Sequence, residues 1–243
     1  MAIYNREDEY IKLLSEREHT VKELSDKLFI SEPTVRRDII VLRDKEILDC
    51  KRGVVRLRLS TPDERVPMFL RNLAHTEEKN AIARKCAAHI KDGYTLMLDA
   101  STSAYCLVPY LASFKNLFVI TNGAHTAIAL AAMGIKTLSV GGEITSDSYC
   151  FYGPDAERTV SAYNADVAIF SCRGINEQGA LTDSTIFENS IRRIMMQNSR
   201  KRIALCDSSK FGKTYLHTLC HTRDVDEIIS DSPLPSYARP SSV

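Results

Sequence analysis

The chain has 243 residues and a formal net charge of +1, and 44% of the residues are hydrophobic while 26% are charged. These values are ordinary for a soluble globular protein, and the length allows one large domain or two smaller ones. They exclude an overall bias toward nucleic acid or membrane, so any DNA-binding surface would have to be a local concentration of charge.

The cysteines and the N-terminus indicate the cellular compartment. Seven cysteines are present and no two have CxxC spacing, which argues against a disulfide framework or a zinc knuckle and fits a reduced cytoplasm. The N-terminus carries charges within its first ten residues, and no apolar run approaches the ~18–20 residues that span a bilayer. We therefore expect a cytoplasmic protein with no membrane partner, no metal and no cofactor.

The sequence pattern divides the chain into four parts. Residues 1–58 are dense in charge and helical in period, whereas after about residue 94 short apolar runs alternate with helical stretches, which is typical of an α/β domain with a mostly parallel sheet. We expect strands at 94–98, 117–121, 136–140, 166–171, 202–206 and 227–230. The predicted organisation is a small α+β domain at 1–58, a linker at 59–75, the α/β domain at 76–231 and a disordered tail at 232–243.

Three helices are expected in the N-terminal domain. The first covers 6–17, and the second begins after Thr20, which forms the residue pair of a capping box with Glu23. The third begins after Ser31 and has Pro33 in its first turn, where the missing N–H of proline costs nothing. The apolar side chains of this third helix recur at i, i+4 and i+7 and are Val35, Ile39 and Leu42.

The opposite face of the third helix has the side chains of a major-groove reader. The residues on this face are Glu32, Pro33, Thr34, Arg36, Arg37 and Ile40. A short helix, a tight turn and a second helix with hydroxyl and arginine residues at its exposed start form a helix-turn-helix. Arginine can pair bidentately with guanine, which gives about 1–3 kcal/mol of discrimination, and Ser31 and Thr34 could bond phosphate oxygens.

A basic hairpin is expected after this helix. Residues 47–50 and 54–57 read as two strands joined by the turn Lys51-Arg52-Gly53, and the segment 51–58 holds four positive charges and no negative one. Such a wing can lie on the DNA backbone, although a merely solvated charged face is the alternative. The candidate DNA-binding residues are Thr20, Ser31, Pro33, Thr34, Arg36, Arg37, Lys51, Arg52 and Arg56.

The loop after the first predicted strand of the α/β domain is a candidate anion site. The segment Asp99-Ala100-Ser101-Thr102-Ser103 joins that strand to a helix, so backbone N–H groups and hydroxyls converge there, although simple helix capping by Ser101 or Thr102 is an equal alternative. Polar or glycine-rich loops follow other runs at 121–123, 141–143, 171–174 and 207–210. Ligands of open α/β sheets bind at such strand ends, so we expect one shared small-molecule site.

Both halves resemble the DeoR family of bacterial transcriptional regulators. In the N-terminal half the resemblance is carried by Thr20-Val21-Lys22-Glu23-Leu24 and by Ser31-x-x-Thr34-Val35-Arg36-Arg37-Asp38-Ile39-x-x-Leu42. The wing departs from the family, which usually has a double glycine where this chain has Gly53-Val54-Val55. In the C-terminal half it is carried by Glu78-Lys79, Asp99-x-Ser101-Thr102, Thr121-Asn122, Gly141-Gly142, Tyr152-Gly153-Pro154, Leu181-Thr182-Asp183 and Asp207-Ser208-Ser209-Lys210-Phe211.

The resemblance implies a fold similar to ribose-5-phosphate isomerase in the C-terminal half, and a phosphorylated sugar or related metabolite as effector. It implies that Ser101, Thr102 and Ser103 hold the phosphate, and that Asp99, Asn122, Arg173, Asp183 and Lys210 contact hydroxyls or add charge. The full set of candidate effector-binding residues is Asp99, Ser101, Thr102, Ser103, Thr121, Asn122, Gly141, Gly142, Arg173, Gly174, Asp183 and Lys210.

The expected function is repression of a sugar or polyol operon by a homo-oligomer, a dimer or tetramer, that binds double-stranded operator DNA. One alternative is a sugar-phosphate isomerase, but its acidic Asp-Gly-Ala-Asp-type loop is replaced by Ser171-Cys172-Arg173-Gly174, so we expect no enzyme and no catalytic residues. A metal- or redox-responsive regulator is the other alternative, because His217 and His221 have i, i+4 spacing around Cys220 and could bind a metal if that segment is helical.

Overall fold

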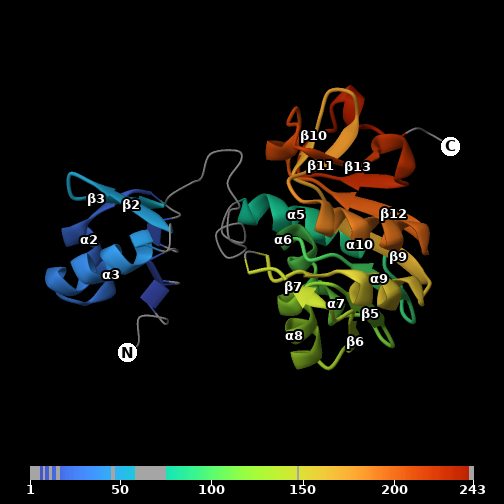
Figure 1. The fold of residues 1–243 in the computed structure, drawn as a ribbon, viewed down its shortest axis with the longest axis horizontal. Helices are drawn as coiled ribbons and strands as arrows, with labels where there is room; N and C mark the ends of the chain where they lie inside the picture. The colour runs from blue at the N-terminus through green and yellow to red at the C-terminus, as the bar shows by residue number, and fades with distance from the viewer. Residues whose placement is uncertain are drawn as a thin grey trace. The chain divides into compact units, whose positions relative to one another are not determined.

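The computed structural model describes residues 6–7, 9–10, 13–14, 17–44, 47–57, 75–146 and 148–240. The chain divides into two compact units, Met1–Ala74 and His75–Val243 (Figure 1). Of the predicted first helix, residues 6–7, 9–10 and 13–14 are helical. The predicted linker at 59–75 lies outside the described residues except for His75.

The N-terminal unit combines helices with a small antiparallel sheet. Its elements are β1 (His19–Thr20), α2 (Val21–Leu28), α3 (Glu32–Asp44), β2 (Leu48–Lys51) and β3 (Val54–Leu57), and the strand order is β1-β3-β2. The predicted capping box is present, since the Glu23 amide donates to Thr20 Oγ1 at 3.2 Å and the Thr20 amide donates to Glu23 Oε2 at 2.7 Å. That backbone bond, with the Arg17 and Thr20 side chains, lowers the pKa of Glu23 to about 2, so the cap stays charged.

The C-terminal unit is built on a six-stranded parallel sheet. The strands are β4 (Thr95–Leu98), β5 (Phe118–Thr121), β6 (Lys136–Ser139), β9 (Ala165–Ser171), β12 (Ser199–Leu205) and β14 (Glu227–Ile229). Their order is β14-β12-β9-β4-β5-β6, and every neighbouring pair is parallel. All six predicted strands are confirmed, with ends that differ by up to three residues.

Helices cover both faces of this sheet, and alternation along the strands explains how. Leu96 and Leu98 of β4 join one buried apolar cluster while Met97 joins the other. The first cluster includes residues of α5 (Thr76–Ala87), α7 (Val108–Leu111) and α8 (Ala124–Ala132). The second includes residues of α9 (Pro154–Ser161) and α10 (Ile186–Gln197). A sheet buried on both faces requires the continuous apolar runs from which it was predicted.

A second, antiparallel sheet was not predicted. Its strands are β10 (Gly174–Ile175), β11 (Ala180–Asp183) and β13 (His217–His221), in the order β10-β11-β13, and a two-stranded sheet joins β7 (Glu143–Ile144) to β8 (Phe151–Tyr152). The metal alternative required a helix at 217–221, and this was wrong because the segment is a strand. In the part of the chain described, no group of three or more His, Cys, Asp or Glu residues is placed to hold a metal ion.

The predicted disorder of the C-terminal tail was wrong for residues 232–240. A 3-10 helix, η3 (Ser236–Ala238), forms there. Ala238 is fully buried in the apolar cluster that includes residues of α9 and α10. Leu234 and Tyr237 pack on the same cluster, so a few apolar side chains at the right spacing outweigh a composition rich in proline and serine. Residues 241–243 lie outside the described residues. None of the described helices is both long and apolar enough for a membrane span.

Candidate nucleic-acid interface and effector site

Helix α3 exposes the face that the sequence predicted. Its buried residues are Val35, Asp38, Ile39 and Leu42, and its exposed positions include Pro33, Arg36, Arg37 and Ile40. The i, i+4, i+7 spacing of the apolar residues therefore fixes which side of the helix remains free. This free side carries two guanidinium groups in its middle, which suits contact with a nucleic acid.

Asp38 is a charged residue on the buried face of α3, and it ties the helix to the first helical segment. Arg6 donates to its carboxylate through Nε at 3.0 Å and through Nη2 at 3.2 Å, and the Tyr10 hydroxyl donates to it at 3.4 Å. Burial and the nearby Asp38 charge raise the pKa of Tyr10. The aspartate of the Arg-Arg-Asp sequence thus positions the recognition helix instead of facing DNA.

The hydroxyl residues at the start of the helices have local partners. Ser31 Oγ and Thr34 Oγ1 lie 2.9 Å apart, and both residues keep some exposure at the N-terminus of α3. Thr20 is occupied by its capping box. Arg36 Nη2 lies 3.6 Å from Glu32 Oε2, whereas Arg37 is exposed and forms no ion pair within the described part of the chain, which leaves its guanidinium available to an external anion.

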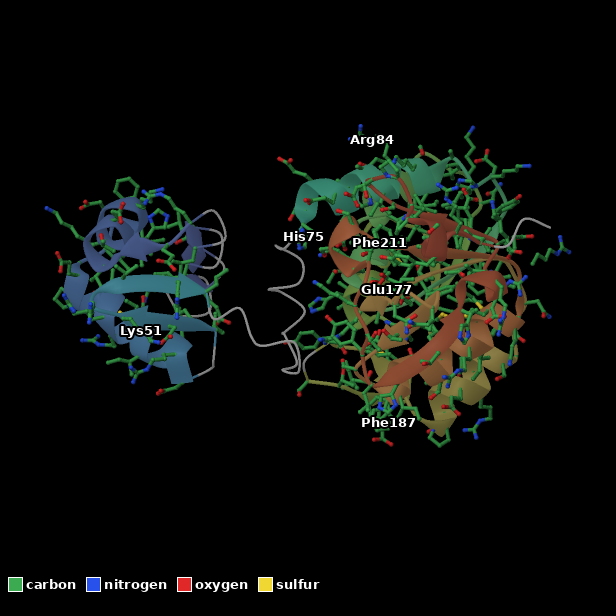
Figure 2. The ribbon with its side chains drawn as sticks, turned by 90° about the horizontal axis from the view of Figure 1, so that it is seen from above. Lys51, His75, Arg84, Glu177, Phe187 and Phe211 are labelled. Carbon is green, nitrogen blue, oxygen red and sulfur yellow. The ribbon has the colours of Figure 1, made fainter. Side chains whose placement is uncertain are left out.

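The predicted basic hairpin is present, with a two-residue turn at Arg52 and Gly53. Their φ values of 52° and 78° match the turn type that follows the twist of a β-hairpin. Because Val54 already lies in β3, the hairpin closes without the second glycine usual in the family. Lys51 and Arg52 are exposed (Figure 2 labels Lys51). Arg56 is partly neutralised, at 3.6 Å from Asp49 and 3.9 Å from Glu18.

In the C-terminal unit, Asp99 follows β4 and is fully buried. Its carboxylate accepts from the amides of Ser101 and Ser171, each at 3.1 Å, from Arg192 Nε at 2.7 Å and from the Ser101 hydroxyl. Ser101 also caps α6 (Thr102–Tyr105) by accepting from the Ala104 amide at 3.1 Å. The Asp99 carboxylate therefore holds the ends of two strands and a helix start together.

Arg192 of α10 is a residue of the candidate site that the sequence did not predict. Its guanidinium donates to Asp99, Asp183 and Glu188, each at 2.7 Å, and only 3% of its side chain is exposed. Burial opposes the charged form, but the three carboxylates raise the pKa of Arg192 well above its ordinary value. A signal was present, since Glu188 and Arg192 stand at i, i+4 on the face of α10 that also buries Met195.

Lys210, in the 3-10 helix η1 (Ser208–Lys210), links the loops after three strands. Its Nζ lies 2.6 Å from Ser171 Oγ, 3.4 Å from Ser103 Oγ and 3.5 Å from Asp207 Oδ2. Burial opposes its charge, but the carboxylate of Asp207 raises the pKa of Lys210. The amides of Thr102 and Ser103 lie in the first turn of α6, next to this lysine. Two amides and an ammonium group make the site suitable for an anion.

The loop after β5 lies against the loop after β4. A Cβ atom on Gly123 would come within 3.1 Å of Ala100 Cα. Thr121 Oγ1 accepts from the Gly123 amide, and Asn122 Nδ2 donates to Cys150 Sγ at 3.0 Å. Asn122 Oδ1 is buried and has no hydrogen-bond partner in the described part of the structure. The amide oxygen of Asn122 is therefore a buried, unsatisfied acceptor in the loop that lies against the loop after β4.

The remaining predicted effector residues have structural explanations. Gly141 and Gly142 have φ values of 68° and 97°, and a Cβ on Gly142 would lie 2.6 Å from the Tyr152 carbonyl oxygen. A Cβ on Gly174 would lie 2.5 Å from the carbonyl oxygen of Lys213. The positive φ accounts for Gly141, around which a Cβ would meet nothing within 4 Å, whereas close packing accounts for Gly142 and Gly174. Arg173 Nε lies 3.6 Å from an Asp183 oxygen, which joins both residues to the network around Arg192.

Comparison with known proteins gives the same division of the chain. The family described as DeoR-like helix-turn-helix domain matches residues 6–60, and the family described as DeoR C terminal sensor domain matches residues 74–232. The uncharacterized HTH-type transcriptional regulator YulB of Bacillus subtilis is 30% identical over 96% of this chain and 91% of its own length.

Two relatives from Escherichia coli have more specific names. The glycerol-3-phosphate regulon repressor is 29% identical and matches 89% of this chain and 85% of its own length. The L-fucose operon activator is also 29% identical, over 90% of each chain.

Solved structures match at lower identity. The translation initiation factor eIF-2B of Pyrococcus horikoshii is 13% identical with a TM-score of 0.51 and covers 94% of this chain and 88% of that one. A ribose 5-phosphate isomerase of Methanocaldococcus jannaschii is 15% identical with a TM-score of 0.43, over 57% of this chain and 55% of that one. The first of these matches concerns the fold alone. With a helix-turn-helix unit and a sensor unit that both match family descriptions, the chain belongs to the DeoR family of DNA-binding transcriptional regulators.

Proposed function

We propose that a phosphorylated sugar or a related metabolite controls this regulator by binding at the carboxyl ends of the parallel strands. The observation that carries the proposal is the position of Lys210, whose ammonium group lies within hydrogen-bond distance of Ser103 at the start of α6. A phosphate group beside Ser103 could accept from the ammonium, from the Ser103 hydroxyl and from the Thr102 and Ser103 amides at the start of α6.

The roles of the other polar residues divide into contact and support. Asn122 Oδ1, which has no partner among the described residues, is suited to accept a hydrogen bond from a sugar hydroxyl. Asp99 and Asp183 are held by Arg192, so we assign them to positioning the loops instead of contacting the ligand. This assignment changes the expectation that both carboxylates bind hydroxyls.

The direction of control, repression or activation, is a separate proposal. The glycerol-3-phosphate relative is named a repressor and the L-fucose relative an activator, and we propose repression that a bound metabolite relieves. The ligand can shift the equilibrium only as far as its affinity differs between the DNA-binding and weak-binding arrangements.

We further propose that the protein acts as at least a dimer, joined mainly through the C-terminal unit. Large apolar side chains on this unit support this, since Ile186 and Phe187 at the start of α10 are 50% and 46% exposed. A dimer would place two winged helices on half-sites separated by whole turns of DNA. Sedimentation of the full chain over a range of concentrations tests the proposal, and a monomer at every concentration would contradict it.

The effector proposal is tested by thermal shift with sugar phosphates, the matching unphosphorylated sugars and inorganic phosphate. A true effector at 100 times its dissociation constant adds about 2.7 kcal/mol of stability. Lys210→Met should lose the shift while DNA binding persists, because the lysine is remote in sequence from the helix-turn-helix. Lys213→Met, at an exposed position of the same loop, is the control and should keep it. Equal shifts in both variants would place the site elsewhere.

An isomerase activity is the rival assignment for the same unit. Isomerisation needs a general base free to approach the substrate carbon atoms, but Asp99 and Asp183 are both bonded to Arg192. We therefore propose a regulator without enzymatic activity. Conversion of an aldose phosphate to a ketose phosphate by purified protein, above a control without protein, would overturn this.

A further inference from the structure

Ile40 is a large apolar side chain that the fold leaves uncovered on the recognition helix. It is 55% exposed, although α3 buries Val35, Ile39 and Leu42 in the core of the N-terminal unit. An isoleucine at an exposed helix position has no advantage for the helix itself, because β-branched side chains lose rotamer freedom there. Its side chain is therefore available to a partner outside the N-terminal core.

The neighbours of Ile40 on the helix surface indicate what would cover it. Pro33, Arg36, Arg37 and Ile40 are all exposed and stand at i, i+3, i+4 and i+7, which places them in one row along the helix. The two guanidinium groups in the middle of this row favour an anionic partner. Residues with this spacing on one helix can reach base edges together in the major groove.

In the major groove, the apolar group available to an apolar side chain is the C5-methyl of thymine. Ile40 is three residues beyond Arg37, so it lies about 4.5 Å further along the helix axis. This step is close to the ~3.4 Å separation of successive base pairs. An isoleucine at that place would meet the base pair next to one contacted by an arginine.

We propose that Ile40 is a specificity-determining residue, which packs against the C5-methyl group of a thymine in each operator half-site. The inference rests on the DNA-binding role of α3 and adds a base preference to it. Arg36 and Arg37 supply charge and hydrogen bonds, while Ile40 selects a T·A pair by contact with a methyl group that cytosine lacks.

The first arm of the test is selection of duplexes from a randomised pool by the full-length chain, by Ile40→Ala and by Ile128→Ala. Ile128 lies in α8 and is 69% exposed, so it is a matched control for loss of an exposed isoleucine. The original chain and the Ile128 variant should enrich the same sequence. The Ile40 variant should enrich a sequence that differs at one thymine position of each half-site.

The second arm replaces that thymine by uracil, which lacks only the methyl group. Loss of one buried methyl should weaken binding of the original chain about fourfold, and it should leave binding by Ile40→Ala unchanged. An equal effect of uracil on both proteins, or an identical enriched sequence for both, overturns the inference alone. A pool in which the original chain enriches no sequence overturns both the inference and the DNA-reading role of α3.

Discussion

At the scale of single residues, Arg37 of α3 gives a prediction about operator binding. It is exposed and forms no ion pair in the part of the chain that the structure describes, whereas Arg36 lies near Glu32. We expect Arg37→Ala to weaken operator binding by about 1–3 kcal/mol, the value of one good bidentate contact with guanine.

The control for this variant is Arg84→Ala, which also removes one positive charge. Arg84 is exposed on α5 of the C-terminal unit (Figure 2). Titrations at several salt concentrations separate the two possible roles of Arg37. If it contacts only phosphate, binding should weaken equally on all sequences and the salt slope should fall by about one. Unchanged affinity for operator DNA would exclude Arg37 from the interface.

At the scale of elements, the strands that were easiest to predict form the parallel sheet. Each is a continuous apolar run, because both of its faces are covered by helices. The antiparallel sheet escaped prediction because β10 has two residues and β13 is partly polar, with the sequence His-Thr-Leu-Cys-His. Arg192 escaped because periodicity assigns charged residues to the outside of a helix, and only its contacts reveal the buried network.

The buried network of α10 gives a prediction about stability. Arg192→Met leaves the carboxylates of Asp99, Asp183 and Glu188 without their shared partner, and removal of one member of a buried ion pair typically costs about 3–5 kcal/mol. The control is Arg200→Met, since the Arg200 side chain is 86% exposed and, among the described residues, pairs with Asp166 alone at 3.5 Å, so its loss should cost about 0–1 kcal/mol. Urea unfolding measures both, and equal costs would contradict a central role for Arg192.

At the scale of the whole molecule, the sequence sufficed to predict two units of different architecture and most of the loops that gather at one sheet edge. It did not predict that Asp99 and Asp183 are hydrogen-bonded to Arg192. Which polar residues bind one another instead of a ligand depends on their positions in the folded chain. It also missed the order in the C-terminal segment, because η3 depends on Leu234 and Tyr237 finding the apolar cluster next to α10.

The packed C-terminal segment determines where this protein can be shortened or fused. Backbone of Tyr237 lies against Gly179, where an added Cβ would come within 2.9 Å of its carbonyl oxygen. Deletion of residues 233–243 should therefore lower stability by about 2–4 kcal/mol, through loss of buried apolar area, whereas deletion of 241–243 should be neutral in the same thermal melt. Equal melting of the two would contradict this. The match to the sensor family ends at residue 232, so a fragment cut there would lack part of its own core, and an affinity tag or degradation signal belongs after residue 240.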